Sequence, residues 1–533
     1  MISKRSGGSV RRGFTLVGTL MALALTAGCA SLTTVPGHPV AAPQPLPSVG
    51  DYYAQRVQWQ PCPEQPEADC GEIRIPVDYT DPGNQAIAMP LIRLRATNPD
   101  SRLGVLTMNP GGPGESGYQQ VLAALDPDDT GLRKFRIRYD LVGFDPRGVG
   151  RTAPVRCLDD EATDAYFATD FTPTTPEQLT AVATAHRTYA AACLRNTGRL
   201  LGFVGTEFVA KDMDIMRSAL GEAKLNYLGF SYGSRLGLYY AEEFPNRVGR
   251  MVLDSVDDPS ASTDRWAFEE AGATPVAARL APRDQVVYDM LSACAARTDC
   301  PLGNDAAAAM TDLRALIDKV DAQPLPVDDG RSLGSNLALL GLFETTYDTS
   351  YQRRFEQAIV AARRGDGTPL AELADRYVGR GADGRFSSAD PAFWAIQCAN
   401  DEPADYRSKT EDQIMTALSR VADRYAVPGP LFGANRVFST PLCLFWQVPP
   451  SRKSAGVDAA GAPTIVLINN TEDPATPLAD AEHVAETLAD AVLVVNEHDG
   501  HIAFDNGSEC VDGIVLGYFF DGQLPARGTR CRN

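Results

Sequence analysis

Short apolar runs alternate with longer helical stretches along most of this chain. The apolar runs lack the strict polar–apolar alternation of a half-exposed strand, as expected for parallel strands that are covered on both faces. The pattern therefore predicts an α/β fold built on a mostly parallel sheet. The expected strands are 104–108, 139–144, 225–230, 250–253, 464–468 and 491–495.

A long interval separates the expected strand at 250–253 from the one at 464–468. A crossover between parallel strands needs far fewer residues, so a large segment is inserted there. The helical patterns inside it lie at 284–296, 306–322 and 354–365. We therefore expect a large, mainly helical cap, which would restrict substrate size and exclude water. The expected division is a core segment at 52–258, the cap at 259–455 and a second core segment at 456–533.

The N-terminus has the organisation of an export signal. Residues 1–28 contain basic residues, no acidic residue and an apolar run too short to span a bilayer. The run ends in Leu25-Thr26-Ala27-Gly28-Cys29, which resembles a bacterial lipoprotein processing site with Cys29 as the lipidated residue. The proline- and alanine-rich stretch 29–51 predicts a tether. We expect an extracytoplasmic protein of the cell envelope, anchored to the cell membrane by lipid, with plain secretion as the alternative.

The charge and the cysteines agree with export. The formal net charge is −19, and such an acidic surface repels nucleic acid, so we expect no nucleic-acid partner. Ten cysteines remain once Cys29 is set aside. Their even number predicts up to five disulfides in an oxidising compartment, with some buried free thiols as the alternative.

No cysteine pair has the C-x-x-C spacing of a zinc site, so we expect no structural metal. The sequence leaves the disulfide connectivity open. Pairing of neighbours along the chain would give Cys62–Cys70, Cys157–Cys193, Cys294–Cys300, Cys398–Cys443 and Cys510–Cys531.

The strongest chemical signal is Gly229-Phe230-Ser231-Tyr232-Gly233, a G-x-S-x-G motif between a strand-like run and a helical pattern. A serine at such a sharp turn sits in strained backbone, which requires flanking residues almost without side chains. The motif predicts Ser231 as a nucleophile, with the Tyr232 N–H and the dipole of the following helix facing a developing oxyanion. An ordinary surface turn is the alternative.

The chain contains only five histidines, so the general base can be sought by elimination. His38 lies in the expected tether, and His186 and His483 lie in alanine-rich helical patterns, where packed or solvated histidines are common. His498 and His501 follow the last expected strand, where the base lies if the order is Ser, acid, His. We favour His501 and keep His498 as the alternative. A metal-binding pair is disfavoured because no further ligands accompany it.

The acid that orients the base is expected one strand earlier. Asp473 follows the expected strand 464–468 and is the favoured residue. Its neighbour Glu472 is one alternative. Asp254 is another, because it follows the strand 250–253, where some hydrolases place their acid.

Five motifs in this order resemble those of one enzyme family. They are Asn109-Pro110-Gly111-Gly112-Pro113-Gly114 with Glu115-Ser116-Gly117, Phe144-Asp145-Pro146-Arg147-Gly148, Gly229-Phe230-Ser231-Tyr232-Gly233, Asp473-Pro474-Ala475-Thr476-Pro477 and Gly500-His501. Together they resemble the actinobacterial tripeptidyl aminopeptidases. These are proline-iminopeptidase-related serine hydrolases, a group that includes mycobacterial cell-envelope serine proteases also known as carboxylesterases. The resemblance extends from about residue 55 to the C-terminus.

The resemblance implies an α/β-hydrolase fold and a triad of Ser231, Asp473 and His501. It also implies that the Tyr232 N–H and the Gly111–Gly112 backbone bind the oxyanion, and that the cysteines pair as neighbours. No cofactor is implied.

One departure from the family pattern concerns the substrate. The family has a cap motif A-I-x-C-x-D, whose acid is a candidate for holding the free α-amine of a peptide. Here Asn400 takes the place of that acid, and Asp401 and Glu402 follow it. A buried ammonium needs a facing carboxylate, because an unpaired buried charge is costly. Asp401 and Glu402 are therefore candidates for the amine site, with solvated loop acids as the alternative.

The sequence thus favours acyl transfer through an acyl-enzyme on Ser231. The favoured substrate is a short peptide with a free N-terminus, and a carboxylesterase or lipase with the same triad is the alternative. A lipid-anchored binding protein on an inactive hydrolase fold is a third hypothesis, which the complete Ser, Asp, His order argues against. The sequence indicates no oligomeric state.

Overall fold

The computed structural model describes residues 48–126, 130–261, 274–400, 409–425, 429–451 and 456–532. The expected signal peptide, Cys29, most of the expected tether, Asp401 and Glu402 lie outside these residues. Among the residues that are described, no helix is both long and apolar enough to cross a membrane.

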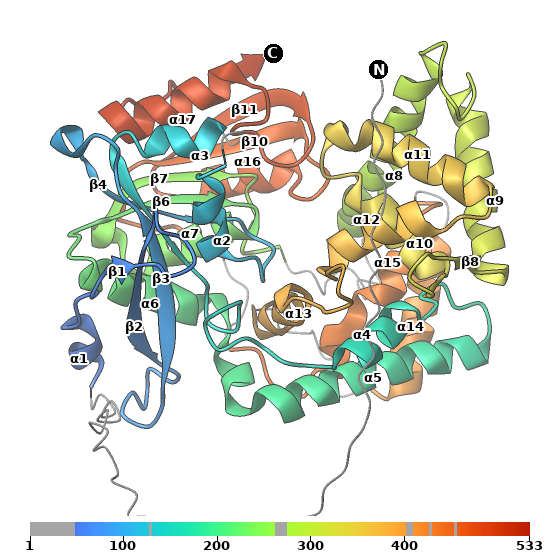
Figure 1. The fold of residues 1–533 in the computed structure, drawn as a ribbon, viewed down its shortest axis with the longest axis horizontal. Coiled ribbons are helices and arrows are strands. Elements are labelled where there is room, and N and C mark those ends of the chain that lie inside the picture. The colour runs from blue at the N-terminus through green and yellow to red at the C-terminus, as the bar shows by residue number, and fades with distance from the viewer. Residues whose placement is uncertain are drawn as a thin grey trace, which may run out of the picture. The chain divides into compact units, whose positions relative to one another are not determined.

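A ten-stranded sheet lies at the centre of the described chain, in the order β1-β2-β3-β5-β4-β6-β7-β10-β11-β12 (Figure 1). The strands from β5 to β12 in this order are parallel, and β1, β2 and β3 are antiparallel to their neighbours. The bounds are β1 (Gln60–Pro61), β2 (Asp69–Pro76), β3 (Ala86–Leu94), β4 (Gly104–Asn109), β5 (Tyr139–Phe144), β6 (Leu225–Phe230), β7 (Val248–Asp254), β10 (Ile465–Glu472), β11 (Ala491–Asp499) and β12 (Arg530–Arg532). Every strand expected from the sequence is present, and the predicted α/β class is confirmed.

Alternate residues of the central strands pack on opposite faces of the sheet, as the pleat requires. In β10, Ile465 and Leu467 join one apolar cluster, whereas Val466 and Ile468 join the other. The first cluster is covered by α1 (Val49–Tyr53), α6 (Thr206–Ala219), α7 (Tyr232–Glu243) and α16 (Leu478–Thr487). The second is covered by α2 (Gly117–Ala123), α3 (Thr130–Phe135) and α17 (Glu509–Asp521).

The helix α1 overlaps the end of the stretch that the sequence predicts as a tether. Tyr52 is fully buried in the first cluster, and its hydroxyl donates a hydrogen bond to the Pro82 carbonyl at 2.8 Å. The folded part of the chain therefore begins a few residues before the expected boundary at 51.

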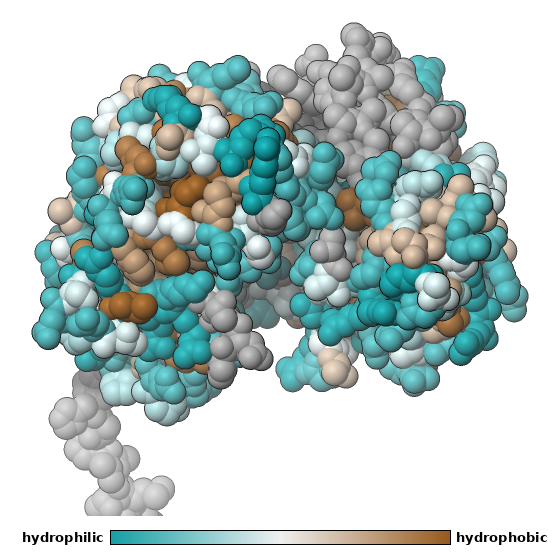
Figure 2. All heavy atoms as spheres, turned by 90° about the horizontal axis from the view of Figure 1, so that it is seen from above, coloured by the Kyte–Doolittle hydropathy of each residue, from teal (hydrophilic) through white to brown (hydrophobic). Residues whose placement is uncertain are grey.

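A third apolar cluster is formed mainly by the segment between β7 and β10. Its helices are α8 (Thr274–Ala295), α9 (Ala306–Ala322), α10 (Ser335–Glu344), α11 (Gln352–Arg363), α12 (Thr368–Val378), α13 (Ala389–Asn400), α14 (Glu411–Tyr425) and α15 (Gly433–Ser439), and a small antiparallel pair joins β8 (Leu325–Pro326) to β9 (Ser332–Leu333). Figure 1 shows these helices beside the sheet domain, and Figure 2 shows a notch between the two on one face. This segment is called the cap below.

Two further helices pack against the cap, although they come from a part of the chain that was expected to belong wholly to the core. α4 (Asp160–Phe167) and α5 (Pro176–Thr197) lie between β5 and β6. Figure 1 shows both helices beside those of the cap. Apolar residues of both, including Tyr166 and Tyr189, are buried in the third cluster. The expected boundaries 52–258 and 259–455 therefore do not separate the sheet domain from the helices of the third cluster. The apolar face of the helix at 176–197 packs against the cap and not against the sheet.

The structure contains disulfides at the pairs that neighbour pairing and the family resemblance suggest. They are Cys62–Cys70, Cys157–Cys193, Cys294–Cys300, Cys398–Cys443 and Cys510–Cys531. Each closes a loop of the unfolded chain and lowers its conformational entropy.

A buried ion pair fixes the loop that follows β5. The Arg147 side chain is inaccessible to solvent and donates from Nε and Nη2 to the two Asp212 carboxylate oxygens at 2.7 and 2.6 Å. It also donates to the carbonyl oxygens of Pro76 and Val77, both at 2.8 Å. The pair thereby joins the end of β2, the loop after β5 and α6.

We expect Arg147→Met to lower the free energy of unfolding by about 3–5 kcal/mol, because the Asp212 carboxylate would remain buried without its cation. Urea unfolding monitored by circular dichroism measures this change. The control is Arg530→Met, which removes an ion pair with Glu497 at the surface and should change stability little. Equal effects of the two substitutions would contradict this account of the Arg147 pair.

Candidate active site

Ser231 stands at a sharp turn between β6 and α7, in strained backbone with φ 55° and ψ −126°. A Cβ atom at Gly233 would lie 2.4 Å from the Asn109 carbonyl oxygen, and one at Gly229 would lie 2.3 Å from the Gly233 carbonyl oxygen. Only glycine fits at both positions. The packing around the turn thus explains the G-x-S-x-G spacing.

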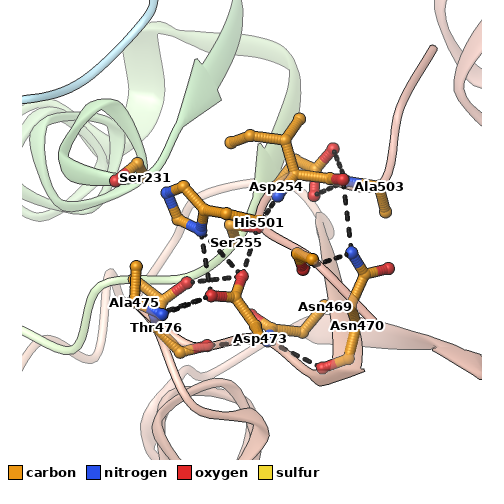
Figure 3. Close-up of polar contacts among 12 residues, drawn as sticks. Ser231, Asp254, Ser255, Asn469, Asn470, Asp473, Ala475, Thr476, His501 and Ala503 are labelled. Atoms are coloured by element: carbon orange, nitrogen blue, oxygen red, sulfur yellow. Dashed lines mark hydrogen bonds and ion pairs between the residues drawn. The ribbon is translucent and has the colours of Figure 1, made fainter. Parts of the chain in front are cut away.

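The structure brings His501 and Asp473 together beside this serine. His501 Nδ1 lies 2.9 Å from each carboxylate oxygen of Asp473. Figure 3 shows the imidazole between Asp473 and Ser231, with its other nitrogen toward the serine. The described contacts include no hydrogen bond from Ser231 Oγ to the imidazole, and such contacts often shorten only when substrate is bound.

The Asp473 carboxylate is buried and accepts several hydrogen bonds besides that of His501. The donors are Ser255 Oγ at 2.7 Å, the Ala475 N–H at 2.8 Å, and the N–H and Oγ1 of Thr476, both at 2.9 Å. Burial by itself would raise the pKa of Asp473, but His501 and these donors outweigh it and lower that pKa. An ionised carboxylate only accepts hydrogen bonds. The His501 proton therefore lies on Nδ1, and Nε2 is free to act as a base.

The alternatives to Asp473 and His501 are exposed or have other hydrogen-bond partners. Glu472 is exposed, and His498 Nδ1 pairs with Asp499. Asp254 is fully buried, but its carboxylate accepts hydrogen bonds from the backbone N–H groups of Ala503 and Phe504 rather than from the imidazole. Burial raises the pKa of Asp254 to about 6. Asp254 thus supports the segment that follows the base.

Ser255 is a functional residue that the sequence analysis missed. Its backbone has φ 57°, and its hydroxyl accepts the Ile502 N–H at 2.8 Å while it donates to Asp473. The Ser255 N–H donates to the Ile468 carbonyl at 2.9 Å, and the Ser231 N–H donates to the Asp254 carbonyl at 2.9 Å. The end of β7 therefore contacts the loops that contain Ser231, Asp473 and His501. The only signal in the sequence was its place directly after an expected strand.

The two glycines expected at an oxyanion site differ in the structure. The Gly111 N–H already donates to Asn109 Oδ1 at 3.0 Å. A Cβ atom at Gly111 would lie 2.9 Å from the Ser231 Cβ, so this glycine allows the two loops to approach closely. Within the described part of the chain, the N–H groups of Gly112 and Tyr232 have no partner, and both residues line the cavity next to Ser231. These two N–H groups can bind an oxyanion together.

A cavity of about 650 Å³ lies over Ser231 and His501, between the sheet domain and the cap. The cap contributes mostly aromatic and charged side chains to its wall. Tyr347 connects the cap to the base, because its carbonyl accepts the His501 N–H at 3.2 Å and its ring centroid lies 5.8 Å from that of the imidazole. The wall thus encloses the reacting groups in a partly apolar space.

Asn400, which replaces the acid of the family motif, is buried outside this wall. Its Oδ1 accepts the Thr206 N–H at 2.8 Å, at the first residue of α6. The asparagine therefore caps a helix of the sheet domain. Asp401 and Glu402, the expected amine-binding candidates, lie outside the described residues.

His38 lies outside the described residues, and His186 and His483 contact groups away from Ser231. His186 is buried, with Nε2 2.7 Å from the Phe438 carbonyl oxygen, and burial lowers its pKa to about 4. His483 Nδ1 contacts Asp258 at 2.8 Å. In the ranges that the structure covers, no group of three or more His, Cys, Asp and Glu side chains could hold a metal ion.

Comparison with known proteins places this geometry in a family. Residues 104–275 match the family described as alpha/beta hydrolase fold, and residues 429–531 match the family described as TAP-like protein. The chain is 34% identical over 498 residues to the serine protease Hip1 of Mycobacterium tuberculosis, which covers 90% of this chain and 91% of the relative. The chain belongs to the TAP-like α/β-hydrolases. This family membership makes the protein a serine hydrolase.

Other relatives of this chain have names that refer to different reactions. Carboxylesterase B of Mycobacterium tuberculosis is 35% identical over 511 residues, or 93% of this chain and 91% of the relative. The tripeptidyl aminopeptidase of Streptomyces lividans is 27% identical over 565 residues, or 99% of this chain and 98% of the relative.

We expect Asp473→Asn to lower kcat by about 10⁴-fold, because the amide would favour the wrong imidazole tautomer. Asp254→Asn is the matched variant, since it changes a second buried carboxylate at a strand end. It should lower the melting temperature and cost far less activity. Hydrolysis of p-nitrophenyl butyrate by the two variants measures the difference. A larger loss of activity in Asp254→Asn would make Asp254 the acid instead.

Proposed function

We propose that this serine hydrolase cleaves short peptides from free N-termini, with Ser231, Asp473 and His501 as the catalytic triad. The main support for the triad is the position of the His501 imidazole, which lies between the Asp473 carboxylate and Ser231, a residue with strained backbone. The Gly112 and Tyr232 N–H groups beside Ser231 support an oxyanion hole.

The proposed reaction is acyl transfer in two steps. His501 Nε2 takes the Ser231 hydroxyl proton as Oγ attacks the carbonyl carbon, and the negative charge develops on an oxygen near Gly112 and Tyr232. His501 then returns the proton to the leaving amine, and the carbon–nitrogen bond breaks. A water molecule repeats the sequence on the acyl-enzyme and releases the acid. No step needs a cofactor.

A free α-amine requires a carboxylate in the cavity, and Glu115 meets this requirement. It lines the cavity three residues after Gly112 and has no side-chain partner among the described residues. Glu115 is an exposed residue, but the protein around its carboxyl group partly desolvates it and raises its pKa, and the nearby negative charge of Glu344 adds to the effect. A substrate ammonium would relieve both costs. Asp401 and Glu402 stay candidates for the same role.

The relatives support both peptide and ester chemistry. Those named serine protease and tripeptidyl aminopeptidase favour peptide cleavage. The relative named carboxylesterase B favours the alternative, an esterase with the same triad. Acyl transfer itself does not distinguish the two.

The location of the enzyme is part of the proposal. The leader at 1–28, the cysteine at position 29 and the proline-rich stretch after it support lipid anchoring at the outer face of the cell membrane. The disulfides suit an oxidising compartment.

We expect the enzyme to hydrolyse a tripeptide p-nitroanilide with a free α-amine faster than its N-acetylated twin. Ser231→Ala should lower the rate about a millionfold, as loss of such a serine does in a related mechanism. Steady-state release of p-nitroaniline measures both effects, with p-nitrophenyl butyrate as the ester comparison. Ester turnover without peptide cleavage would favour the carboxylesterase, and full activity of Ser231→Ala would exclude the triad.

We expect Glu115→Gln to remove the preference for the free amine, since the amide carries no charge to pair with the ammonium. The rate on the N-acetylated peptide should change little and serves as the internal control. The raised pKa of Glu115 adds a pH dependence. The preference should decline on acidification at a higher pH than an ordinary carboxyl group would cause, because only the ionised form binds the amine. An unchanged preference in Glu115→Gln would assign the amine to another residue.

A further inference from the structure

Two arginine side chains from the cap line the cavity and share one aromatic ring. The Arg283 guanidinium carbon lies 4.1 Å from the centre of the Phe343 ring, and that of Arg436 lies 4.8 Å from it. The Tyr347 ring lies 4.2 Å from the same atom of Arg283. These residues come from α8, α10 and α15 and from the turn after α10. They are called the arginine corner below, together with Tyr377, which also lines the cavity.

Neither arginine of the corner is paired with a carboxylate in the described part of the chain. Arg283 is only 4% exposed, and its guanidinium donates a hydrogen bond to Thr346 Oγ1. The adjacent Asp284 is turned away and accepts the Leu431 N–H at 2.7 Å. Arg436 has no hydrogen bond from its guanidinium to any described residue.

Two carboxylates near the corner, Glu344 and Asp390, have partners of their own, whereas Glu115 lines the same cavity and is the proposed partner of the substrate amine. Glu344 accepts hydrogen bonds from Arg376 Nε at 2.9 Å and from the Tyr351 hydroxyl at 3.2 Å, although the charge of Arg283 also acts on it. Asp390 accepts the Tyr189 hydroxyl at 2.7 Å. The positive charges of both arginines favour the ionised form of Tyr377 and so oppose the rise in its pKa that burial causes. The corner therefore holds two positive charges and one phenol without a dedicated anion.

Most cap arginines show the opposite arrangement. Arg331 pairs with Asp375 at 2.6 Å, Arg380 with Asp164 at 2.9 Å and Arg297 with Glu356 at 2.7 Å. A buried cation without a counter-charge is unfavourable, and contacts with aromatic rings offset only part of this cost. An anion that enters the cavity would complete the corner.

The corner lies close to the reacting groups. Tyr347 contacts Arg283 with its ring and also contacts His501 with its ring and its carbonyl. A substrate whose scissile bond lies at Ser231 therefore passes the corner within a residue or two of that bond.

We propose that Arg283 and Arg436 bind a carboxylate of the substrate and give the enzyme a preference for peptides that carry this carboxylate. The carboxylate has two sources, which are an aspartate or glutamate side chain near the scissile bond and the free C-terminus of the leaving peptide. This proposal rests on the proposed function, since it assigns the specificity of the same cavity.

The first test measures binding without catalysis. Ser231→Ala, with the rest of the chain intact, is titrated by calorimetry with matched tetrapeptides that carry aspartate or asparagine at one position, and with C-terminal acids or amides. We expect about tenfold tighter binding of the peptide that carries the recognised carboxylate, as charge-assisted hydrogen bonds to a guanidinium provide. Preference for the aspartate peptides assigns the corner to a side chain, and preference for the free acids assigns it to the C-terminus. Equal binding of all four overturns the proposal.

The second test assigns the preference to the corner. Arg436→Gln in the Ser231→Ala background should remove the preference and leave the binding of the neutral peptides unchanged. Arg376→Gln is the matched control, because Arg376 lines the same cavity but is paired with Glu344. The Arg376→Gln variant should keep the preference for the carboxylate. An equal loss of this preference in both variants would overturn its assignment to the arginine corner. Melting temperatures verify that each variant is folded.

Rates with the active enzyme separate this proposal from the proposed function. Peptide cleavage at equal rates for aspartate and asparagine peptides, and for C-terminal acids and amides, overturns the arginine corner and leaves the peptidase intact. Absence of all peptide cleavage, with tight binding of the acidic peptide to Ser231→Ala, overturns the peptidase and supports the corner.

Discussion

Two consecutive residues at the end of β7 hold together the loops on which the active site depends. The Asp254 carbonyl receives the Ser231 N–H, and the Asp254 carboxylate receives the two N–H groups that follow Ile502. Ser255 donates its hydroxyl to Asp473 and accepts the Ile502 N–H. The three residues of the proposed triad thus come from loops far apart in the chain, and all three loops are hydrogen-bonded to the end of one strand. Such preorganisation keeps the donors and acceptors in place without rearrangement during the reaction.

Local patterns explain why the sequence predicted the centre of the sheet and the proposed triad residues. A buried parallel strand is a short apolar run whatever it pairs with, and the turn at Ser231 needs its glycines at fixed spacing. The antiparallel strands β2 and β3 went unnoticed because they are half-exposed and contain prolines and charges. The pairing of Gly111 with Asn109 was also hidden, since it depends on the fold of a loop and not on the type of either residue.

The cap shows the same limit on a larger scale. Its helices were expected from their periodicity. The contribution of α4 and α5 depends on which apolar helix faces pack together from distant parts of the chain, and periodicity contains no such information. The roles proposed for Glu115 and the arginine corner were not predicted for a related reason. A charged residue in a sequence is normally a solvated one, and only the fold shows that these three side chains line one cavity.

The contact of Tyr347 with His501 has a consequence for how the enzyme varies. Tyr347, in the turn after α10, lines the cavity that a substrate enters. Its carbonyl oxygen also accepts the His501 N–H and so helps to position His501. Recognition and reactivity therefore share a backbone segment, and the two properties are not free to change separately. A substitution that reshapes this wall to admit a different substrate also moves the carbonyl that supports the imidazole. Changes of specificity that leave the rate intact are therefore confined to the parts of the cap that do not contact the base, of which α15 with Arg436 is one.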